Sequence, residues 1–232
     1  MTQFFAGKNC LIIFFCFFAV LYCNAAGQDS VSTVYRKGEY VTTTIVKVNA
    51  SPVVMNAVID DFLYQTRYNL DGLYNWALVG LKLRKEADDI IIFNFKSTEY
   101  DIKKDIIKGI GEVVVPGIIT FPEIHVNSRM TKKLQANENI TVNIDVLYSD
   151  AFLKKTNALF KMVPNDSKSC TISLETQVKF GWFFDFFISQ SLFRQIMEWR
   201  FVRLMKNLGN EAVLRETNKN RTFERKVQQK NK

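Results

Sequence analysis

The feature that most constrains this chain is a long amphipathic stretch near its C-terminus, residues 179–214. Apolar side chains recur in it at steps of three or four residues: Phe193, Met197, Phe201, Leu204 and Leu208. That is the spacing of one face of an α-helix, which repeats every ~3.6 residues. Because a helix of this length rises ~1.5 Å per residue, it can cross a whole small domain and close a sheet.

The first 26 residues have the order of parts of a signal peptide. Lys8 supplies a positive charge, an apolar run follows from Cys10 to Cys23, and small residues come at Ala25 and Ala26. The run is short for a membrane span. We therefore expect residues 1–26 to be removed, and the mature protein to be exported to the periplasm or secreted. An uncleaved N-terminal anchor is the alternative.

The cysteines fit this interpretation. Three of the four lie in the leader, so Cys170 is alone in the mature chain and cannot form an internal disulfide. An exported domain without a disulfide must be stabilised by its core. With 232 residues, 47% of them hydrophobic, the chain can form one core of ordinary size.

The two ends of the mature chain are polar. Residues 27–34 are small and polar, and we expect a lead-in with no core of its own. Residues 215–232 hold seven Lys or Arg and two Glu, so they carry a net charge of +5 out of the chain's total of +8. This composition predicts a basic tail that is disordered or a frayed helical extension. The tail is either solubilising or a contact for an anionic membrane surface or polyanion. The nearly neutral body argues against nucleic-acid binding.

The first part of the mature chain predicts a strand followed by helices. Residues 39–48 are mostly β-branched. Ser51 is a suitable N-cap and Pro52 suits the first turn of a helix. The spacing of the apolar residues that follow predicts a helix with one buried face: Met55, Val58, Ile59 and Phe62. A second short helix or irregular segment is expected over Leu73, Tyr74 and Trp76.

A succession of strands is predicted next. Short apolar runs recur around Leu81 and Leu83 and in residues 90–96, 100–102, 106–115, 118–126, 140–148, 158–163 and 170–180. Residues 140–148 alternate most clearly, with Ile140 and Tyr148 predicted on the same side. A polar turn between the last two runs indicates a hairpin. Gly109, Gly111 and Gly117 indicate bends, bulges or close approach.

This order of elements resembles the START-like superfamily, also called helix-grip, polyketide cyclase or Bet v 1-like. The local match is best at VKVNASPVVMNAVIDDF and at TISLETQVKFGWFF, and the resemblance covers residues 35–214. It implies an α+β fold. A curved antiparallel sheet would wrap around a long C-terminal helix, with two short helices after the first strand and an apolar cavity between sheet and helix.

The resemblance also implies a function. Members of the superfamily bind lipids or other hydrophobic molecules, so the leading expectation is non-catalytic binding of such a ligand in the cavity. The side chains expected to line it are Phe93, Phe95, His125, Tyr148, Phe193, Met197 and Phe201. A hydrophobic small molecule or lipid is the expected partner, and peripheral membrane contact is a further expectation. No functional motif of the superfamily is present to carry over.

The sequence predicts no catalytic motif, metal site or cofactor. His125 is the single histidine, whereas zinc sites and nucleophilic triads combine histidine with other ligands or catalytic groups. Two alternatives stay open. A cyclase or aromatase would need polar groups such as His125, Tyr148 or Glu123 in the cavity. A cell-envelope interaction protein would have its cavity filled by its own side chains.

Two apolar features exceed what a simple core needs. Aromatic residues crowd the segment before the C-terminal helix: Trp182, Phe183, Phe184, Phe186, Phe187 and Phe193. They are core, cavity lining or an exposed apolar loop. The helix itself has a second apolar line on another side, Leu192, Ile196 and Trp199. A helix with two apolar faces needs a partner on each face. The sheet would cover the first face, and a ligand, another subunit or the short helices would cover the second.

Overall fold

The computed structural model describes the backbone of residues 29–83, 91–150, 153–182, 185 and 188–230, and the side chains up to residue 219. The expected signal peptide, residues 1–26, lies outside the described residues. So do four of the aromatic residues noted above, Phe183, Phe184, Phe186 and Phe187.

One antiparallel sheet of eight strands forms the frame of the described part of the chain, in the order β1-β2-β8-β7-β6-β5-β4-β3. Its strands are β1 Ser30–Arg36, β2 Glu39–Val48, β3 Ile92–Asp101, β4 Ile106–Val115, β5 Ile119–Leu134, β6 Ile140–Ser149, β7 Leu153–Pro164 and β8 Cys170–Phe180. The predicted hairpin joins β7 and β8, whose last pair is Pro164 and Cys170.

Within the described residues, three helices accompany the sheet: α2 Pro52–Tyr68, α3 Leu70–Tyr74 and α5 Gln190–Lys230. α2 starts as its sequence predicts, because the Ser51 hydroxyl accepts a hydrogen bond from the Val54 N–H at 3.4 Å and Pro52 follows the cap. Among the described helices, none has both the length and the apolar character needed to span a membrane.

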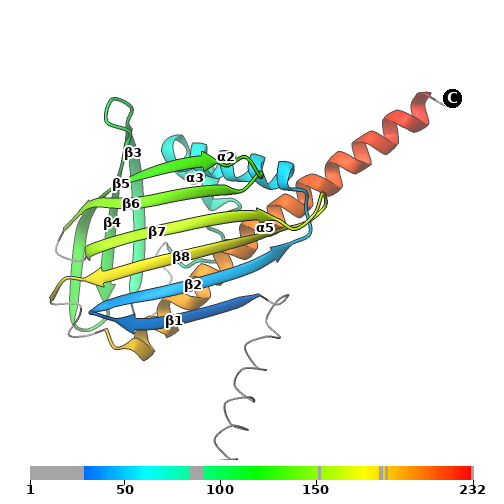
Figure 1. The fold of residues 1–232 in the computed structure, drawn as a ribbon. Coiled ribbons are helices and arrows are strands. Elements are labelled where there is room, and N and C mark those ends of the chain that lie inside the picture. The colour runs from blue at the N-terminus through cyan, green and yellow to red at the C-terminus, as the bar shows by residue number, and fades with distance from the viewer. Residues whose placement is uncertain (1–28, 84–90, 151–152, 183–184, 186–187, 231–232) are drawn as a thin grey trace, which may run out of the picture.

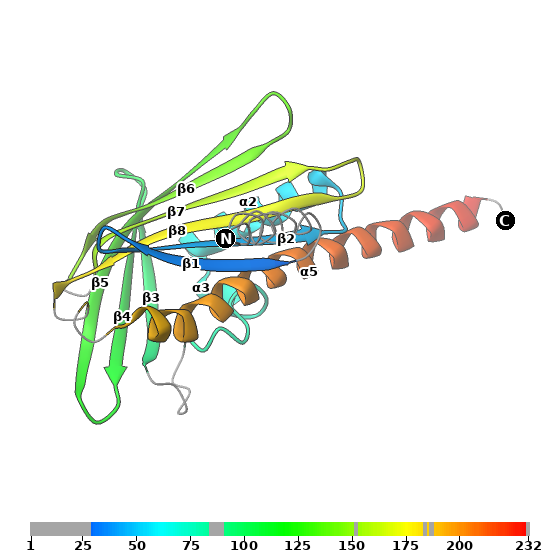
Figure 2. The ribbon, with the colours of Figure 1, turned by 60° about the horizontal axis from the view of Figure 1, so that its bottom comes forward.

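The sheet curves around α5, which crosses its concave side (Figure 1). α5 packs chiefly on β2 and also contacts α2 and β1. α2 and α3 cover the same side of the sheet next to α5 (Figure 2). The predicted α+β helix-grip architecture, with a long C-terminal helix and two short helices early in the chain, is confirmed.

The N-terminal lead-in differs from its prediction. Ser30–Arg36 forms β1, an edge strand paired along its length with β2. Thr33 is buried, and its hydroxyl lies 2.9 Å from that of Thr42 across the pair. The buried side chain of β1 is polar and is hydrogen-bonded to a second threonine. The sequence of β1 therefore lacks the apolar alternation that would indicate a core-facing side.

The segment around Leu81 and Leu83 is also not a strand; it is turn and irregular structure. Its backbone is held by α5, because the Asn207 side chain donates to the carbonyls of Ala77 and Val79 at 2.9 and 3.0 Å. Tertiary hydrogen bonds therefore replace the pairing that a strand would have.

The basic tail is helical, since α5 continues to Lys230. Its first residues dock on the body: Arg215 Nη2 lies 2.6 Å from Asp61 Oδ2, and Glu216 accepts a hydrogen bond from the Ser51 hydroxyl at 2.7 Å. Beyond them the helix projects away from the sheet (Figures 1 and 2).

The concave side of the sheet carries two core clusters. Along β8 every second residue from Cys170 to Phe180 is buried, as period-two alternation requires. The cluster toward α2 centres on Met55, Ile172 and Met205, and we call it the closed end. The cluster under β3, β4 and β5 includes Tyr40, Val113 and Phe193, and we call it the open end.

Candidate functional site

An open groove lies on the concave side of β3, β4 and β5, at the open end. Its volume is about 270 Å³, and its lining is almost entirely apolar. We call it the strand groove. It is lined by Leu83, Phe93, Asn94, Phe95, Gly109, Gly111, Glu112, Val113, Ile124, Val126 and Leu153.

The strand pairing explains why these residues meet. Phe95 pairs with Gly111, and Gly109 pairs with Val126. Paired residues point to the same face of a sheet, and residues two apart along a strand share that face. The aromatic side chains of β3 therefore lie beside glycines of β4, with the branched side chains of β5 beyond them.

The two glycines let β3 and the Phe95 ring pack closely on β4 in the lining of the groove. A Cβ added at Gly109 would lie 3.0 Å from Phe95 Cε2, and one added at Gly111 would lie 3.3 Å from the Asn94 carbonyl oxygen. Both distances are shorter than an ordinary van der Waals contact. A larger residue at Gly109 would push the Phe95 ring away, and one at Gly111 would press on the backbone of β3.

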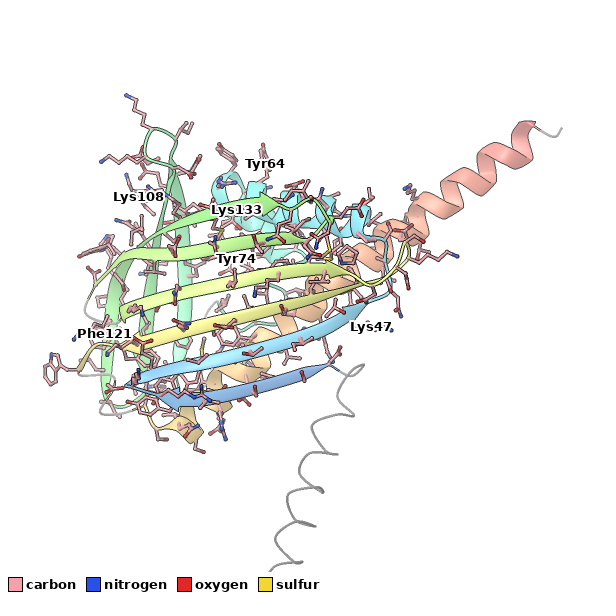
Figure 3. The ribbon with its side chains drawn as sticks, viewed as in Figure 1. Lys47, Tyr64, Tyr74, Lys108, Phe121 and Lys133 are labelled. Atoms are coloured by element: carbon pink, nitrogen blue, oxygen red, sulfur yellow. The ribbon has the colours of Figure 1, made fainter. Side chains whose placement is uncertain are left out.

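One wall of the groove is fixed by hydrogen bonds around Leu83. The Phe95 N–H donates to the Leu83 carbonyl at 2.8 Å. The Tyr74 hydroxyl is 3.3 Å from the carbonyls of Leu83 and Phe95, and Tyr74 is labelled in Figure 3. Arg200 reinforces this wall, because its guanidinium lies 5.1 Å from the Phe93 ring centroid and its Nε donates to the Leu81 carbonyl at 3.0 Å.

Below the strand groove, Tyr40 ties the sheet to the segment before α5. Its ring stacks on Phe193 with centroids 4.2 Å apart, and its hydroxyl donates to the Ile188 carbonyl. Burial, with smaller contributions from Tyr35 and Asp185, raises the pKa of Tyr40 to about 12. The phenol is therefore a structural donor held in its neutral form.

The closed end contrasts with this groove. Its described residues enclose an apolar cavity of about 40 Å³ between α2, α5 and strands β6–β8. The cavity is lined by Ile59, Phe62, Leu63, Val142, Ile144, Phe160, Leu174, Leu204, Met205 and Leu208. Drug-sized ligands occupy roughly 300–1,000 Å³, so the protein's own side chains fill most of this end.

The structure separates the side chains that the sequence predicted as cavity lining. Phe93 and Phe95 line the strand groove. Phe193 is buried and Met197 half-buried in the core cluster of the same end. Phe201 is half-buried and packs against the other cluster, at the closed end.

His125 and Tyr148 do not line the groove, which corrects the prediction. Their strand positions place them on the outer face, where the His125 side chain is 48% exposed and Tyr148 is 53% exposed. His125 alternates with the groove residues Ile124 and Val126, and for Tyr148 the cause is a β-bulge: Ser128 pairs with Val146, but Asn127 pairs with Tyr148. The extra residue, Leu147, reverses the alternation that would have pointed Tyr148 inward.

These two side chains belong to a hydrogen-bonded surface cluster. The Tyr148 hydroxyl donates to Asp150 Oδ1 at 2.7 Å, and His125 Nδ1 lies 3.2 Å from Asp150 Oδ2. The pKa of Asp150 is lowered, first by the backbone N–H of His125 and then by the Tyr148 hydroxyl. His125 Nε2 also lies 3.3 Å from Glu123 Oε1.

The described residues contain no group of three His, Cys, Asp or Glu side chains able to hold a metal ion. The buried thiol of Cys170 is inert, because burial raises its pKa to about 11. Asn94 and Glu112 are the polar residues in the lining, but they alternate with the inward residues of β3 and β4, so their side chains point to the opposite face, where they hydrogen-bond to each other at 3.0 Å.

Sequence reasoning missed Val113, Ile124, Val126 and Leu153 as lining. Val113, Ile124 and Val126 stood within predicted strands, but nothing showed which strands would be neighbours, and Leu153 lay before the predicted start of its strand at residue 158. Gly109 and Gly111 were noted as positions of close approach, and this was the one signal that pointed to the groove.

No protein-family model matches the chain, and no match is found among curated proteins. Solved structures with a similar arrangement include the aromatase/cyclase Zhui from Streptomyces, at a TM-score of 0.47 and 12% identity, covering 76% of this chain and 95% of that one. A START superfamily protein from Mycobacterium smegmatis has a TM-score of 0.45 at 12% identity, covering 75% and 97%. Norcoclaurine synthase from Thalictrum flavum has a TM-score of 0.45 at 16% identity, covering 80% and 99%.

Proposed function

We propose that this protein binds a hydrophobic or lipid-like small molecule in the strand groove and does not transform it. The observation that carries the proposal is the apolar groove of about 270 Å³ on the concave side of β3, β4 and β5, with Gly109 and Gly111 in its lining. Affinity would come from burial of the ligand's apolar surface, at roughly 25 cal/mol per Å².

The groove limits the ligand. Its volume is slightly below the range of sites for drug-sized ligands, which favours a narrow molecule such as a single acyl chain or a small ring system. The lining is almost entirely apolar, so recognition would depend on apolar contact. The open mouth would leave the rest of the ligand in contact with water.

The cyclase or aromatase alternative is weaker. It needs acid–base groups facing the cavity, whereas His125 and Tyr148 lie on the outer face and Glu123 is beside His125. Tyr40 is buried near the groove, and its raised pKa keeps it protonated.

A second candidate, a cell-envelope interaction protein, is favoured by the closed end. At that end the side chains fill most of the space between sheet and helix and leave a cavity of about 40 Å³, as this candidate requires. This candidate would use the outer surfaces of the molecule, and the ligand experiment below distinguishes it.

Export and peripheral membrane contact are parts of the same proposal. Support for export comes from the sequence of residues 1–26, and support for membrane contact from the net +5 charge of residues 215–232. N-terminal sequencing of protein from its native host should find a start near Gly27. An intact Met1 on membrane-embedded protein would contradict export.

The proposed site can be tested with 1-N-phenylnaphthylamine, a neutral apolar fluorescent probe. Val126→Phe should fill the groove and weaken probe binding by about tenfold or more, which corresponds to about 1.4 kcal/mol. Leu134→Phe is the matched control, because Leu134 lies on the same strand and is 67% exposed outside the groove. Wild-type protein that binds no probe, or equal binding by both variants, would refute the site.

A further inference from the structure

A second groove lies on another side of α5, between that helix and the edge strand β1. Its volume is about 630 Å³, and it shares no lining residue with the strand groove. We call it the edge groove. It is lined by Val31, Arg194, Gln195, Glu198, Trp199, Val202, Arg203 and Lys206.

The centre of the edge groove is an aromatic side chain on a fixed support. Trp199 stacks on the guanidinium of Arg200 at 4.6 Å. Arg200 is buried, and its Nε and Nη1 donate to the carbonyls of Leu81 and Ile196 at 3.0 and 2.5 Å. The indole is therefore held in place before any partner arrives. A rigid tryptophan bordered by arginines is typical of binding hot spots.

The rim of the groove is positively charged. Arg194, Arg203 and Lys206 face a single lining acid, Glu198. Glu198 is 3.8 Å from Arg194, and Lys206 is 3.1 Å from Asp29, so the rim keeps a net positive charge when Asp29 is counted. This charge favours an acidic partner. A second copy of the chain, docked through the same face, would bring like charges together.

Hydrogen bonds at the edge of β1 favour a helical partner over a partner strand. The Thr33 carbonyl accepts hydrogen bonds from Arg194 Nη2 at 2.6 Å and Gln190 Nε2 at 3.5 Å. A partner strand added to β1 would need this carbonyl. A helical partner satisfies its own backbone. The lining from Arg194 to Lys206 spans roughly 18 Å at 1.5 Å per residue, which matches about three helical turns.

We propose that the edge groove docks a helical segment of a partner protein. That segment has an apolar face that covers Trp199, Val202 and Val31, and acidic side chains beside it that meet Arg203 and Lys206. Of the second apolar line of α5, Trp199 then belongs to a protein-docking surface, whereas Leu192 and Ile196 pack in the open-end core. This inference does not depend on ligand binding in the strand groove.

Two synthetic helical peptides of about four turns test this proposal. They share one apolar face and differ only in whether the flanking positions are Glu or Lys. The full chain should bind the Glu peptide at least about tenfold more tightly than the Lys peptide in fluorescence anisotropy. The double variant Arg203→Glu, Lys206→Glu should reverse that preference.

Trp199→Ala and Val202→Glu should each weaken binding of the Glu peptide by about tenfold. Trp182→Ala is the control, since Trp182 is 86% exposed and lies outside the groove. Thermal melts establish that each variant is folded. Equal affinity for both peptides, no binding of either, or no effect of both groove variants would overturn the proposal. A wild-type dimer that Val202→Glu dissociates would overturn it too, because a second copy would then occupy the groove.

Discussion

The two ends of the concave side are built on the same curved sheet and the same helix, yet only one is open. At the closed end Met55, Ile172 and Met205 are fully buried and leave a cavity of about 40 Å³. At the open end the Phe95 ring lies over Gly109, close to β4, and a groove of about 270 Å³ stays open. The curvature of the sheet provides space between sheet and helix, and side-chain volume decides where that space becomes a site.

The helix α5 shows the same division along its length. Its first turns contribute Phe193 and Ile196 to the open end, and later turns contribute Met205 and Leu208 to the closed end. The closed end should therefore carry more of the stability, and the open end more of the binding.

The largest effect is expected for Met205→Ala at the closed end. A fully buried methionine cut to alanine should lower the free energy of unfolding by about 2–5 kcal/mol. Met197→Ala is the matched change at the open end, where Met197 is half-buried, and it should cost clearly less. Urea denaturation measures both. An equal loss in the two variants would break the distinction between the ends.

Alkaline pH should act on the two ends in turn. Burial raises the pKa of Cys170, at the closed end, from 9.0 to about 11, and that of Tyr40, at the open end, from 10.0 to about 12. Both folded-state pKa values lie above the unfolded ones, so the neutral forms stabilise the fold. This stability is complete below pH 9 and is lost from pH 9 to 11 for Cys170 and from pH 10 to 12 for Tyr40.

Each group can contribute on the order of 2 kcal/mol. Urea denaturation across pH 8 to 12 should show the free energy of unfolding falling as the pH rises. Cys170→Ala should remove the part of this fall between pH 9 and 11. Tyr40→Phe should remove the later part, with about 1 kcal/mol lost at neutral pH from the hydrogen bond to the Ile188 carbonyl. A flat profile up to pH 12 in the wild-type protein would contradict both assignments.

A smaller effect on stability is expected for Gly109→Ala. The added Cβ lies 3.0 Å from Phe95 Cε2, so the ring must move, at a cost of about 1 kcal/mol. The moved ring narrows the groove, and the affinity for 1-N-phenylnaphthylamine should fall by several-fold. Adding Phe95→Leu should restore part of the stability in a double-mutant cycle. Independent, additive effects would show that these two residues do not share the groove.

The smallest effect is expected outside both ends. Deleting residues 217–232 keeps Arg215 and Glu216, which dock α5 on Asp61 and Ser51. The thermal midpoint should change by no more than about 2 °C, as expected for a change of less than ~0.5 kcal/mol. A fall of many degrees would show that the projecting part of α5 stabilises the body.

The architecture could be predicted from the sequence because its signals are local. The Ser51 and Pro52 cap, the alternation before the bulge in β6 and the three-to-four spacing from Phe193 to Leu208 each depend on neighbours within the chain. β1 could not be predicted, because its buried Thr33 is polar and is satisfied by Thr42.

The candidate site was only half predictable, because it depends on strand neighbours and register. Phe93 and Phe95 were found, since aromatic residues two apart on a strand share a face. Tyr148 was misplaced because one bulged residue, Leu147, reverses the alternation without any mark in the sequence. The Trp199 face of α5 was recognised, but its neighbour β1 was not expected to be a strand.

The most direct test of the account is methyl NMR with the apolar probe bound. Protein with ¹³C-labelled Ile, Leu and Val methyls is titrated with 1-N-phenylnaphthylamine. The largest chemical-shift changes should fall on Val113, Ile124 and Val126, which line the strand groove, while Ile59, Leu204 and Leu208 at the closed end should hardly change. Changes concentrated on the closed-end methyls, or no saturable change at either end, would contradict the claim that the strand groove is the ligand site.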